Sequence, residues 1–528
     1  MATSTPPTQA FTADINIPPS PVPHLLLHGN VPPSEYESTL IRSAILDSQS
    51  SLSQLESRLT AVLREFRRKR KALRRYSQVH QRVLSRKPHI PPEILSSIFT
   101  LCLPSDWKNC HVYARAIPVL LSQVSVYWRH VALSTPRLWS SMDIWLETDV
   151  SDRTVNMFET WLARTHGTLL SIKVSSVDEQ TVTHPILELI LSCSHRWQHF
   201  AFSLPISLTR SLSTVKGKLP CLESLSPHYY YSRPEQLNSF QNAPRLTDLN
   251  LGPHRTFSNL TVPWTQLTKL QADMDLDDVI EILYHSPNLV HLCVSPSDQK
   301  PGTTRSLVQL PHLATLVIDT EEGPTGLFNC LVVPHLRNLD VWLHSFEDAD
   351  RSSTTWWDWL GPLLSLIFTS SCSIQSFTFR TLAVRVDEDD LTRCLQAMPA
   401  LRDLTLQLDD DSADDDFAGN FLHGLIHRSA EPRIIPKLMY LDLRLCLVPS
   451  EHKTLIFMIE SRWRMVDHGG DRVSDKHTLD VARLQVVILR GIYICPKRHS
   501  EMLVRLRKLK DEGMRIELWD SWSEPVTF

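Results

Sequence analysis

PHLATLVI (Pro311–Ile318) and PHLRNLDV (Pro334–Val341) share the pattern P-x-L-x-x-L-x-L, and this pattern decides the fold. Leucines that alternate with period two predict a strand with one buried face. The other clear copies are PRLTDLNL (Pro244–Leu251), PNLVHLCV (Pro287–Val294), PALRDLTL (Pro399–Leu406) and PKLMYLDL (Pro436–Leu443), and the weaker ones are LLSIKV, WQHFAF, QLTKLQA, SIQSFTF and LQVVIL. From Leu246 to Leu336 the first leucines recur every 21 to 24 residues, which is a leucine-rich-repeat period.

Between the copies lie segments that predict helices. LDDVIEILYHSPNL (276–289) has acidic residues near its start and stops before a proline, and DEDDLTRCLQAMPAL (387–401) repeats the plan. Strand and helix alternating at a short period predict parallel strands stacked as a solenoid. We therefore expect an α/β fold with a degenerate leucine-rich-repeat-like domain over residues 150–528. Larger gaps after Leu336 leave the number of repeats open, and leucines scattered through an unrelated α/β domain are the alternative.

The same pattern predicts a polar surface, because residues flanking the second leucine point away from the buried face. Repeat proteins bind partners on such extended faces, so we expect a protein substrate there. Asp340, Asp403 and Asp442 are expected to recognise charge. The acidic balance of the carboxyl-terminal region favours a basic or mixed-charge partner and disfavours nucleic acid. The expected substrate-binding residues are Asp248, Asn250, Lys269, Gln271, His291, Asn338, Asp340, Asp403, Thr405, Tyr440 and Asp442.

The amino-terminal part predicts a tail and a long helix. Residues 1–33 are rich in proline and predict a disordered or polyproline tail. Residues 34–87 contain neither Gly nor Pro and open with a capping box, Ser34 and Glu37. Their heptad pattern predicts a coiled coil, with Lys69 weakening one d position. Its partner is a second copy, with a parallel homodimer slightly favoured, or the protein's own domains. The heptad residues are Ile45, Leu52, Leu59, Phe66 and Leu73 at a, and Ile41, Leu55, Val62, Tyr76 and Val83 at d.

This helix is also basic. Residues 34–87 carry 13 Lys and Arg against 5 Asp and Glu, whereas the whole chain has a net charge of −4. The cations concentrate in REFRRKRKALRRY (Arg64–Tyr76). The stretch shows no aromatic interleaving that suggests base stacking, so a solvated helix face is favoured over nucleic-acid binding or a nuclear-import signal.

Two short amphipathic helices are predicted between Ile90 and Trp139. The first, in IPPEILSSIFTLCLP, has prolines at its start, Glu93 in its first turn and Pro104 after its end. The second apolar face is formed by Val119, Leu120, Val124 and Trp128, with Val131 and Leu133 beyond. A helix pair this small buries little by itself, so it packs on the rest of the chain or offers its apolar face to a partner. An ordinary hairpin inside a larger core is the alternative.

The order and spacing of these residues resemble an F-box of the large fungal F-box families. The departures are Ile90, where Leu is usual, and Ser125, where Cys is common. The match covers about fifty residues, expected as a domain over residues 88–140. The matching residues are Pro91, Pro92, Glu93, Ile94, Leu95, Ile98, Phe99, Leu120, Leu121, Ser122, Gln123, Val124, Trp128, Arg129, Ala132, Leu133, Thr135, Pro136, Leu138 and Trp139.

The resemblance implies binding of a Skp-type adaptor through this segment, and thereby a cullin scaffold and a ubiquitin ligase. The degenerate leucine-rich repeats that often follow an F-box would bind the substrate. The residues expected at the adaptor contact or supporting it are Pro91, Pro92, Glu93, Ile94, Leu95, Ile98, Phe99, Leu120, Val124, Trp128, Leu138 and Trp139.

Signatures of catalysis, cofactor binding and membrane insertion are missing from the sequence. GxGxxG, GxxxxGK[ST], HExxH and GxSxG do not occur. The ten cysteines are scattered without a CxxC pair, which indicates reduced thiols. The acidic run Asp409–Asp416 is better explained as a solvated loop than as a cation site, and WWDWL (Trp356–Leu360) as core packing. Neither a signal peptide nor a membrane span is recognisable.

We therefore expect a non-catalytic, cytoplasmic or nuclear adaptor without a cofactor or metal. A non-ligase scaffold or self-associating interaction protein is the alternative.

Overall fold

The computed structural model describes residues 17–27, 32–84, 90–113, 115–148, 150–178, 181–228, 236–253, 259–297, 306–321, 323–344, 359–382, 388–409, 417–426, 434–444, 451–464, 482–491 and 500–519. The chain divides into two compact units, Met1–Pro91 and Pro92–Phe528. Asp410–Asp416 of the acidic run and Trp356–Asp358 of the aromatic cluster lie outside the described residues. Among the helices that are described, none is long and apolar enough to cross a bilayer.

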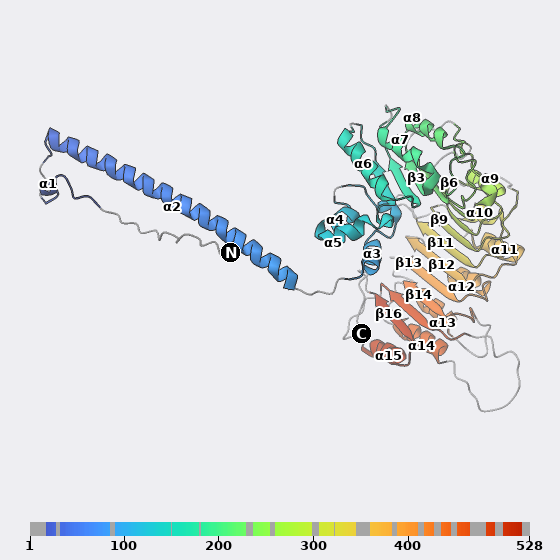
Figure 1. Ribbon diagram of the computed structural model, residues 1–528. Helices are drawn as coiled ribbons and strands as arrows, with labels where there is room; N and C mark the ends of the chain where they lie inside the picture. The colour runs from blue at the N-terminus through green and yellow to red at the C-terminus, as the bar shows by residue number, and fades with distance from the viewer. Residues whose placement is uncertain are drawn as a thin grey trace. The chain divides into compact units, whose positions relative to one another are not determined.

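The first unit contains the predicted long helix, α2, which runs unbroken from Glu35 to Leu84 (Figure 1). The predicted capping box is confirmed, because the Ser34 N–H donates to Glu37 Oε2 at 2.8 Å and the Glu37 N–H donates to Ser34 Oγ at 3.4 Å. Residues 1–16 and 28–31 of the predicted disordered or polyproline tail lie outside the described residues, and within the rest Pro23–Leu27 form a short helix, α1. His24 of α1 contacts Glu37 at 2.9 Å and so ties this turn to the start of α2.

The second unit begins with three α-helices where the sequence predicted two: α3 (Pro92–Leu101), α4 (Ile117–Val124) and α5 (Val126–Leu133). Ser125 divides the second predicted helix because its backbone is extended and its Oγ accepts a hydrogen bond from the Trp128 N–H at 3.1 Å. A serine in this conformation is a favourable N-cap, so it starts a new helix. One 3₁₀ turn, η1 (Trp107–Asn109), lies between α3 and α4, and a second, η2 (Pro136–Leu138), follows α5.

Within the described residues, a parallel sheet of 14 strands follows, with its strands in chain order. Its strands are β1 (Ser141–Trp145), β2 (Leu170–Ser175), β3 (Trp197–Ser203), β4 (Ser224–His228), β5 (Asp248–Pro253), β6 (Lys269–Asp275), β7 (His291–Ser297), β9 (Thr315–Thr320), β11 (Asn338–His344), β12 (Ser376–Leu382), β13 (Asp403–Asp409), β14 (Tyr440–Arg444), β15 (Val486–Arg490) and β16 (Arg515–Trp519). The short strands β8 (Val308–Gln309) and β10 (Leu331–Val332) pair separately. The predicted parallel α/β arrangement is thus confirmed at this coarse level.

Each of the eleven predicted copies coincides with a strand, and the alternating leucines are buried. Leu316 and Ile318 of β9 and Leu339 and Val341 of β11 are at most 2% exposed. Three strands of the large sheet, β1, β4 and β16, were missed, as were the short strands β8 and β10. Of these, β4 keeps the start of the pattern in Pro220, Leu222 and Leu225 but has Pro227 at the last leucine position.

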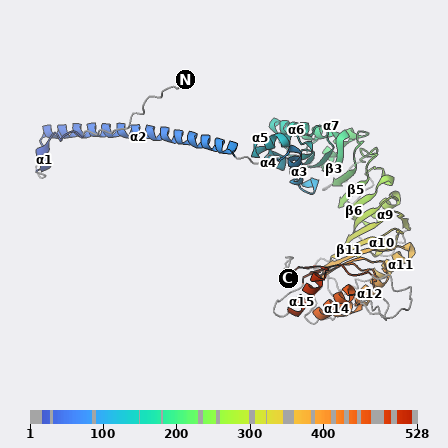
Figure 2. The same cartoon turned by 60° about the horizontal axis from the view of Figure 1, so that its bottom comes forward.

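The helices that follow the strands cover one face of the sheet, and we term the opposite face the open face (Figure 2). The helices are α6 (Asp152–Arg164), α7 (Pro185–Ser192), α8 (Ile206–Thr209), α9 (Leu276–His285), α10 (Thr325–Phe328), α11 (Leu360–Ser370), α12 (Glu388–Gln396), α13 (Phe417–Gly424), α14 (Glu451–Trp463) and α15 (Ser500–Asp511), with the 3₁₀ turns η3 (Ser194–Arg196), η4 (Arg210–Val215) and η5 (Trp264–Gln266).

The predicted boundary near residue 150 does not separate two bodies, because α3–α5 and the sheet form one compact unit. Trp139 lies at their junction. Its Nε1–H donates to the Ala132 carbonyl at 2.9 Å, and its ring meets that of Trp161 of α6 edge-on at 4.8 Å. A shared aromatic core therefore joins α3–α5 to α6 and the first strands of the sheet.

Candidate binding surfaces

The helices α3–α5 expose apolar side chains. Ile94, Ile98 and Leu101 recur at spacings of four and three residues on α3, so they form one stripe, and they are 54%, 41% and 84% exposed. Leu120 and Val124 form a second exposed stripe on α4. Such apolar stripes on short helices are characteristic of surfaces that a partner covers.

The remaining predicted adaptor-binding residues fall into two groups. Pro91, Pro92 and Glu93 are exposed at the start of α3. Leu95, Phe99, Leu138 and Trp139 are at most 1% exposed, so of the two roles expected for these residues, contact or support, only support is open to them. Phe99 packs on Trp128 of α5, with ring centroids 4.9 Å apart, so these side chains hold the helices together and can act only as support.

The eleven predicted substrate-binding residues lie in two neighbouring rows across the open face. Strand register aligns Asp248, Lys269, His291, Asn338, Asp403 and Tyr440 in the first row. The second row, two residues further along each strand, contains Asn250, Gln271, Asp340, Thr405 and Asp442. Neighbouring polar groups bond across the strands, as in the 2.8 Å hydrogen bond from Asn250 Nδ2 to Gln271 Oε1.

Two of the three aspartates expected to recognise charge are already paired within the chain. Arg380 donates to Asp340 Oδ2 at 2.7 Å. Arg490 Nε donates to Asp442 Oδ1 at 2.9 Å, and Asp442 is only 4% exposed. Both pairs are neutral as a unit, so Asp340 and Asp442 do not present isolated negative charge. Asp403 alone of the three is an exposed side chain.

The arginines of these pairs belong to a third row that the sequence analysis missed. It consists of Trp342, Arg380, Gln407, Arg444, Arg490 and Trp519 on six consecutive strands, and we term it the Arg–Trp row. Arg380 lies over the Trp342 ring at 5.4 Å and Arg490 over the Trp519 ring at 5.5 Å. The hydrogen bond from Arg490 to Asp442 also raises the pKa of this guanidinium. The alternation of buried and exposed residues in L-x-L, continued by one more residue, would have predicted that these side chains lie on the open face.

At the other end of the sheet, the segment around η1 crosses the open face. Trp107 stacks on His199 of β3 with ring centroids 5.8 Å apart, and His111 Nδ1 lies 2.7 Å from Asp143 Oδ2 of β1. Burial lowers the pKa of His199, and Lys108 lowers it further, against the opposing effects of Glu223 and Asp248. A cavity of about 610 Å³ opens beside this segment, lined among others by Tyr113, Trp145 and Lys173.

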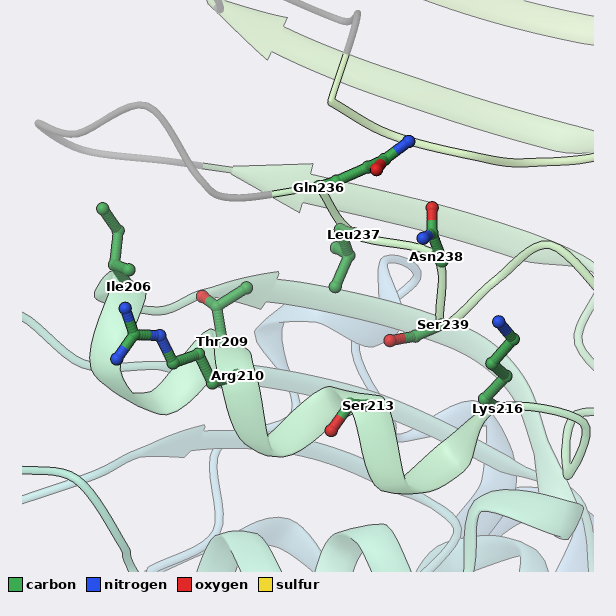
Figure 3. A pocket seen from close by; sticks show the side chains of 9 residues that line it. All are labelled: Ile206, Thr209, Arg210, Ser213, Lys216, Gln236, Leu237, Asn238 and Ser239. Carbon is green, nitrogen blue, oxygen red and sulfur yellow. The ribbon is translucent and has the colours of Figure 1, made fainter.

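A smaller cavity, of about 370 Å³, lies between the α8–η4 stretch and residues 236–239. Figure 3 shows Arg210 and Lys216 toward opposite ends of the helical stretch, with Ser213 between them. Asn238 is held by the Thr261 hydroxyl, which donates to its Oδ1 at 2.6 Å. Among the described residues, no cluster of three or more His, Cys, Asp or Glu is placed to hold a metal ion.

No protein-family model matches the chain, and no curated protein resembles it in sequence. Among solved structures, a protein from Bacteroides fragilis is similar to it at 11% sequence identity and a TM-score of 0.22. The match covers 73% of this chain and 75% of that one.

Proposed function

We propose that the protein is the substrate-recognition adaptor of a Skp–cullin–F-box type ubiquitin ligase. The single observation that carries the proposal is the exposed apolar stripe Ile94, Ile98 and Leu101 on α3, in the segment that resembles an F-box. Beneath the stripe lies a buried layer that includes Leu95 and Phe99. The helices are therefore packed without a partner, and the exposed stripe is accessible to one. The Skp-type adaptor is the partner that the resemblance implies.

The sheet is then the substrate-binding part, as a leucine-rich-repeat-like solenoid. Supporting this are the chain-order parallel strands and the polar open face. The Arg–Trp row supplies the residue types that dominate binding energy at protein interfaces. Within it, the guanidinium of Arg380 contacts Asp340 and Trp342, and that of Arg490 contacts Asp442 and Trp519. Planar guanidinium groups bind carboxylates in a bidentate way, and the paired acids keep the surface electrically mixed. A mixed-charge protein segment therefore fits it best.

Adaptor binding is tested with purified full-length protein and a purified Skp-type adaptor. Replacing Ile98 and Leu120 with Asp introduces charge into both exposed stripes without touching the buried layer. Because such substitutions at an interface centre cost several kcal/mol, we expect affinity to fall at least roughly a hundredfold. Ser365→Asp, at an exposed position on α11 and outside α3–α5, is the control and should bind like the wild type. Equal binding by the double variant, or none by the wild type, would contradict the proposal.

Substrate binding is tested by affinity purification from cells in which ligase activity is inhibited. The double variant Trp342→Ala and Arg444→Ala should lose most of the enriched proteins. The double variant Lys269→Ala and Gln271→Ala, at exposed positions on β6 of the same face, should retain them. If only the β6 variant loses the enriched proteins, the substrate site lies in the middle of the sheet. If neither variant changes the set of enriched proteins, the open face is not the substrate site.

The alternative, a non-ligase scaffold, is favoured by one feature, the length of α2. The adaptor experiment separates the two functions, because a scaffold of this kind has no need of a Skp-type partner.

A further inference from the structure

The long helix α2 carries an apolar seam along its described length. Its a positions, Ile45, Leu52, Leu59, Phe66 and Leu73, are between 50% and 69% exposed. Apolar residues repeated every seven positions bury themselves by supercoiling with another helix. A single turn, α1, contacts the start of α2 through His24 and Glu37, far from most of the seam.

Charge is distributed unevenly along the same helix. Residues 35–59 contain four acidic and two basic residues, a net of −2, whereas residues 60–84 contain one acidic and nine basic residues, a net of +8. The cations of the second half concentrate between Arg64 and Arg75. Alignment of two such halves side by side brings like charges within about the Debye length of one another, about 8 Å at physiological salt.

The continuity of α2 excludes pairing between the two halves of one chain. The helix has no break between Glu35 and Leu84, and at 1.5 Å per residue it is roughly 75 Å long. An αα-hairpin would need a loop between the halves. The negative half can therefore meet the positive half only on another molecule.

We propose that α2 pairs with α2 of a second copy in antiparallel orientation. The heptad-consistent alignment with almost full overlap sets Leu59 opposite Val62 of the other copy and Ile45 opposite Tyr76. The stretch 64–75, with a net charge of +7, then lies beside stretch 46–57, with a net of −2. Arg58 also faces Glu65 across the seam.

The d-position lysine supports the same orientation. In a parallel pair, Lys69 would meet its own counterpart in the core, and each basic stretch would lie beside the other. In the antiparallel pair Lys69 lies opposite Leu52. Its ammonium group already reaches outward to Glu65 at 2.8 Å, so the aliphatic part of Lys69 can cover Leu52 while the charge stays in water.

The orientation is measured by distances between nitroxide labels in the full-length protein, attached through an unnatural amino acid because the chain has ten cysteines. Ser43 and Ser57 both occupy outward f positions. In the antiparallel pair the two Ser43 labels are offset by roughly 50 Å along the helix axis. The two Ser57 labels are offset by only about 10 Å along the same axis. Short distances at both positions would establish a parallel pair and overturn the proposal. So would a monomer in sedimentation, which would show that another part of the chain or another protein covers the seam.

A charge variant gives an independent test, because it should weaken an antiparallel dimer and strengthen a parallel one. Replacing Arg67, Arg68, Lys71 and Arg74 with Gln removes charge from outward positions only. The antiparallel dimer should weaken roughly tenfold, and about 0.5 M salt should have the same effect on the wild type because screening removes the attraction. A parallel dimer would strengthen in both experiments. Gln at Ser43, Ser50, Ser53 and Ser57 is the matched control and leaves the dissociation constant unchanged.

Discussion

At the scale of single residues, Arg462 shows how a buried charge can organise a loop. It is 5% exposed, and its guanidinium donates to the carbonyls of Leu425, Ile434 and Ile435 at 2.7, 2.9 and 3.1 Å. Burial lowers its pKa to about 10, so it remains charged at neutral pH. One side chain of α14 thereby satisfies three backbone acceptors that precede β14.

We expect Arg462→Leu to lower the free energy of unfolding by about 3 kcal/mol, because buried carbonyls are left without donors. Arg464→Leu is the control two residues away. Arg464 pairs with Glu512 at 3.1 Å at a partly exposed site, and such pairs contribute at most about 1 kcal/mol. Urea unfolding of both variants gives the comparison, and equal midpoints would show that water replaces the lost donors.

At the scale of elements, His199 joins the η1 segment to β3, and its folded environment disfavours the charged form of the imidazole. His199 is stacked on Trp107 and has a pKa below the ordinary 6.5. The unfolded chain binds the proton more readily than the folded one, so stability is highest above pH 6.5 and falls as the pH drops toward the lowered pKa.

Acidification from about pH 7 to pH 5 should therefore loosen the η1 segment from the sheet. Hydrogen exchange in residues 107–112 is the measurement, and His199→Gln should remove this part of the acid sensitivity. His291→Gln, at an exposed histidine in the same row, serves as the comparison. Equal acceleration in wild type and His199→Gln would assign the effect to other groups.

The repeated strands were predictable because each is specified locally, by leucines two residues apart. The division between α4 and α5 was also specified locally, by Ser125. It was not predicted because the apolar pattern continues across this position and favours a single helix. The ion pairs were not predictable. Asp442 and Arg490 are 48 residues apart in the chain, and their contact depends on the register between β14 and β15, which no single repeat encodes. Leu95 and Phe99 could likewise be assigned to an apolar helix face. Whether they lie on its buried or its exposed side depends on contacts between elements, which the local sequence does not encode.

At the scale of the whole second unit, the junction around Trp139 makes α3–α5 and the sheet one folding body. The indole is fully buried, Arg164 lies over its ring at 4.4 Å, and its carbonyl accepts a hydrogen bond from Trp161 Nε1 at 3.0 Å. Groups from α5 and α6 therefore meet at this one residue.

Trp139→Ala should cost about 4 kcal/mol and reduce hydrogen-exchange protection in β1–β3 as well as in α3–α5. Trp145→Ala, at a 56% exposed position on β1, should leave protection in both regions unchanged. Loss confined to residues 92–133 would show that the helices fold as a separate domain.

The chain order of the strands has a consequence for inheritance. Each strand of the large sheet pairs only with the strands that precede and follow it within that sheet. An in-frame duplication or deletion of one strand-and-helix segment in the DNA would therefore disturb two neighbours and leave the rest of the sheet, and α3–α5 at its far end, as they were. Recombination could lengthen or shorten the open face, where we propose that the substrate binds, without altering α3–α5, where we propose that the adaptor binds.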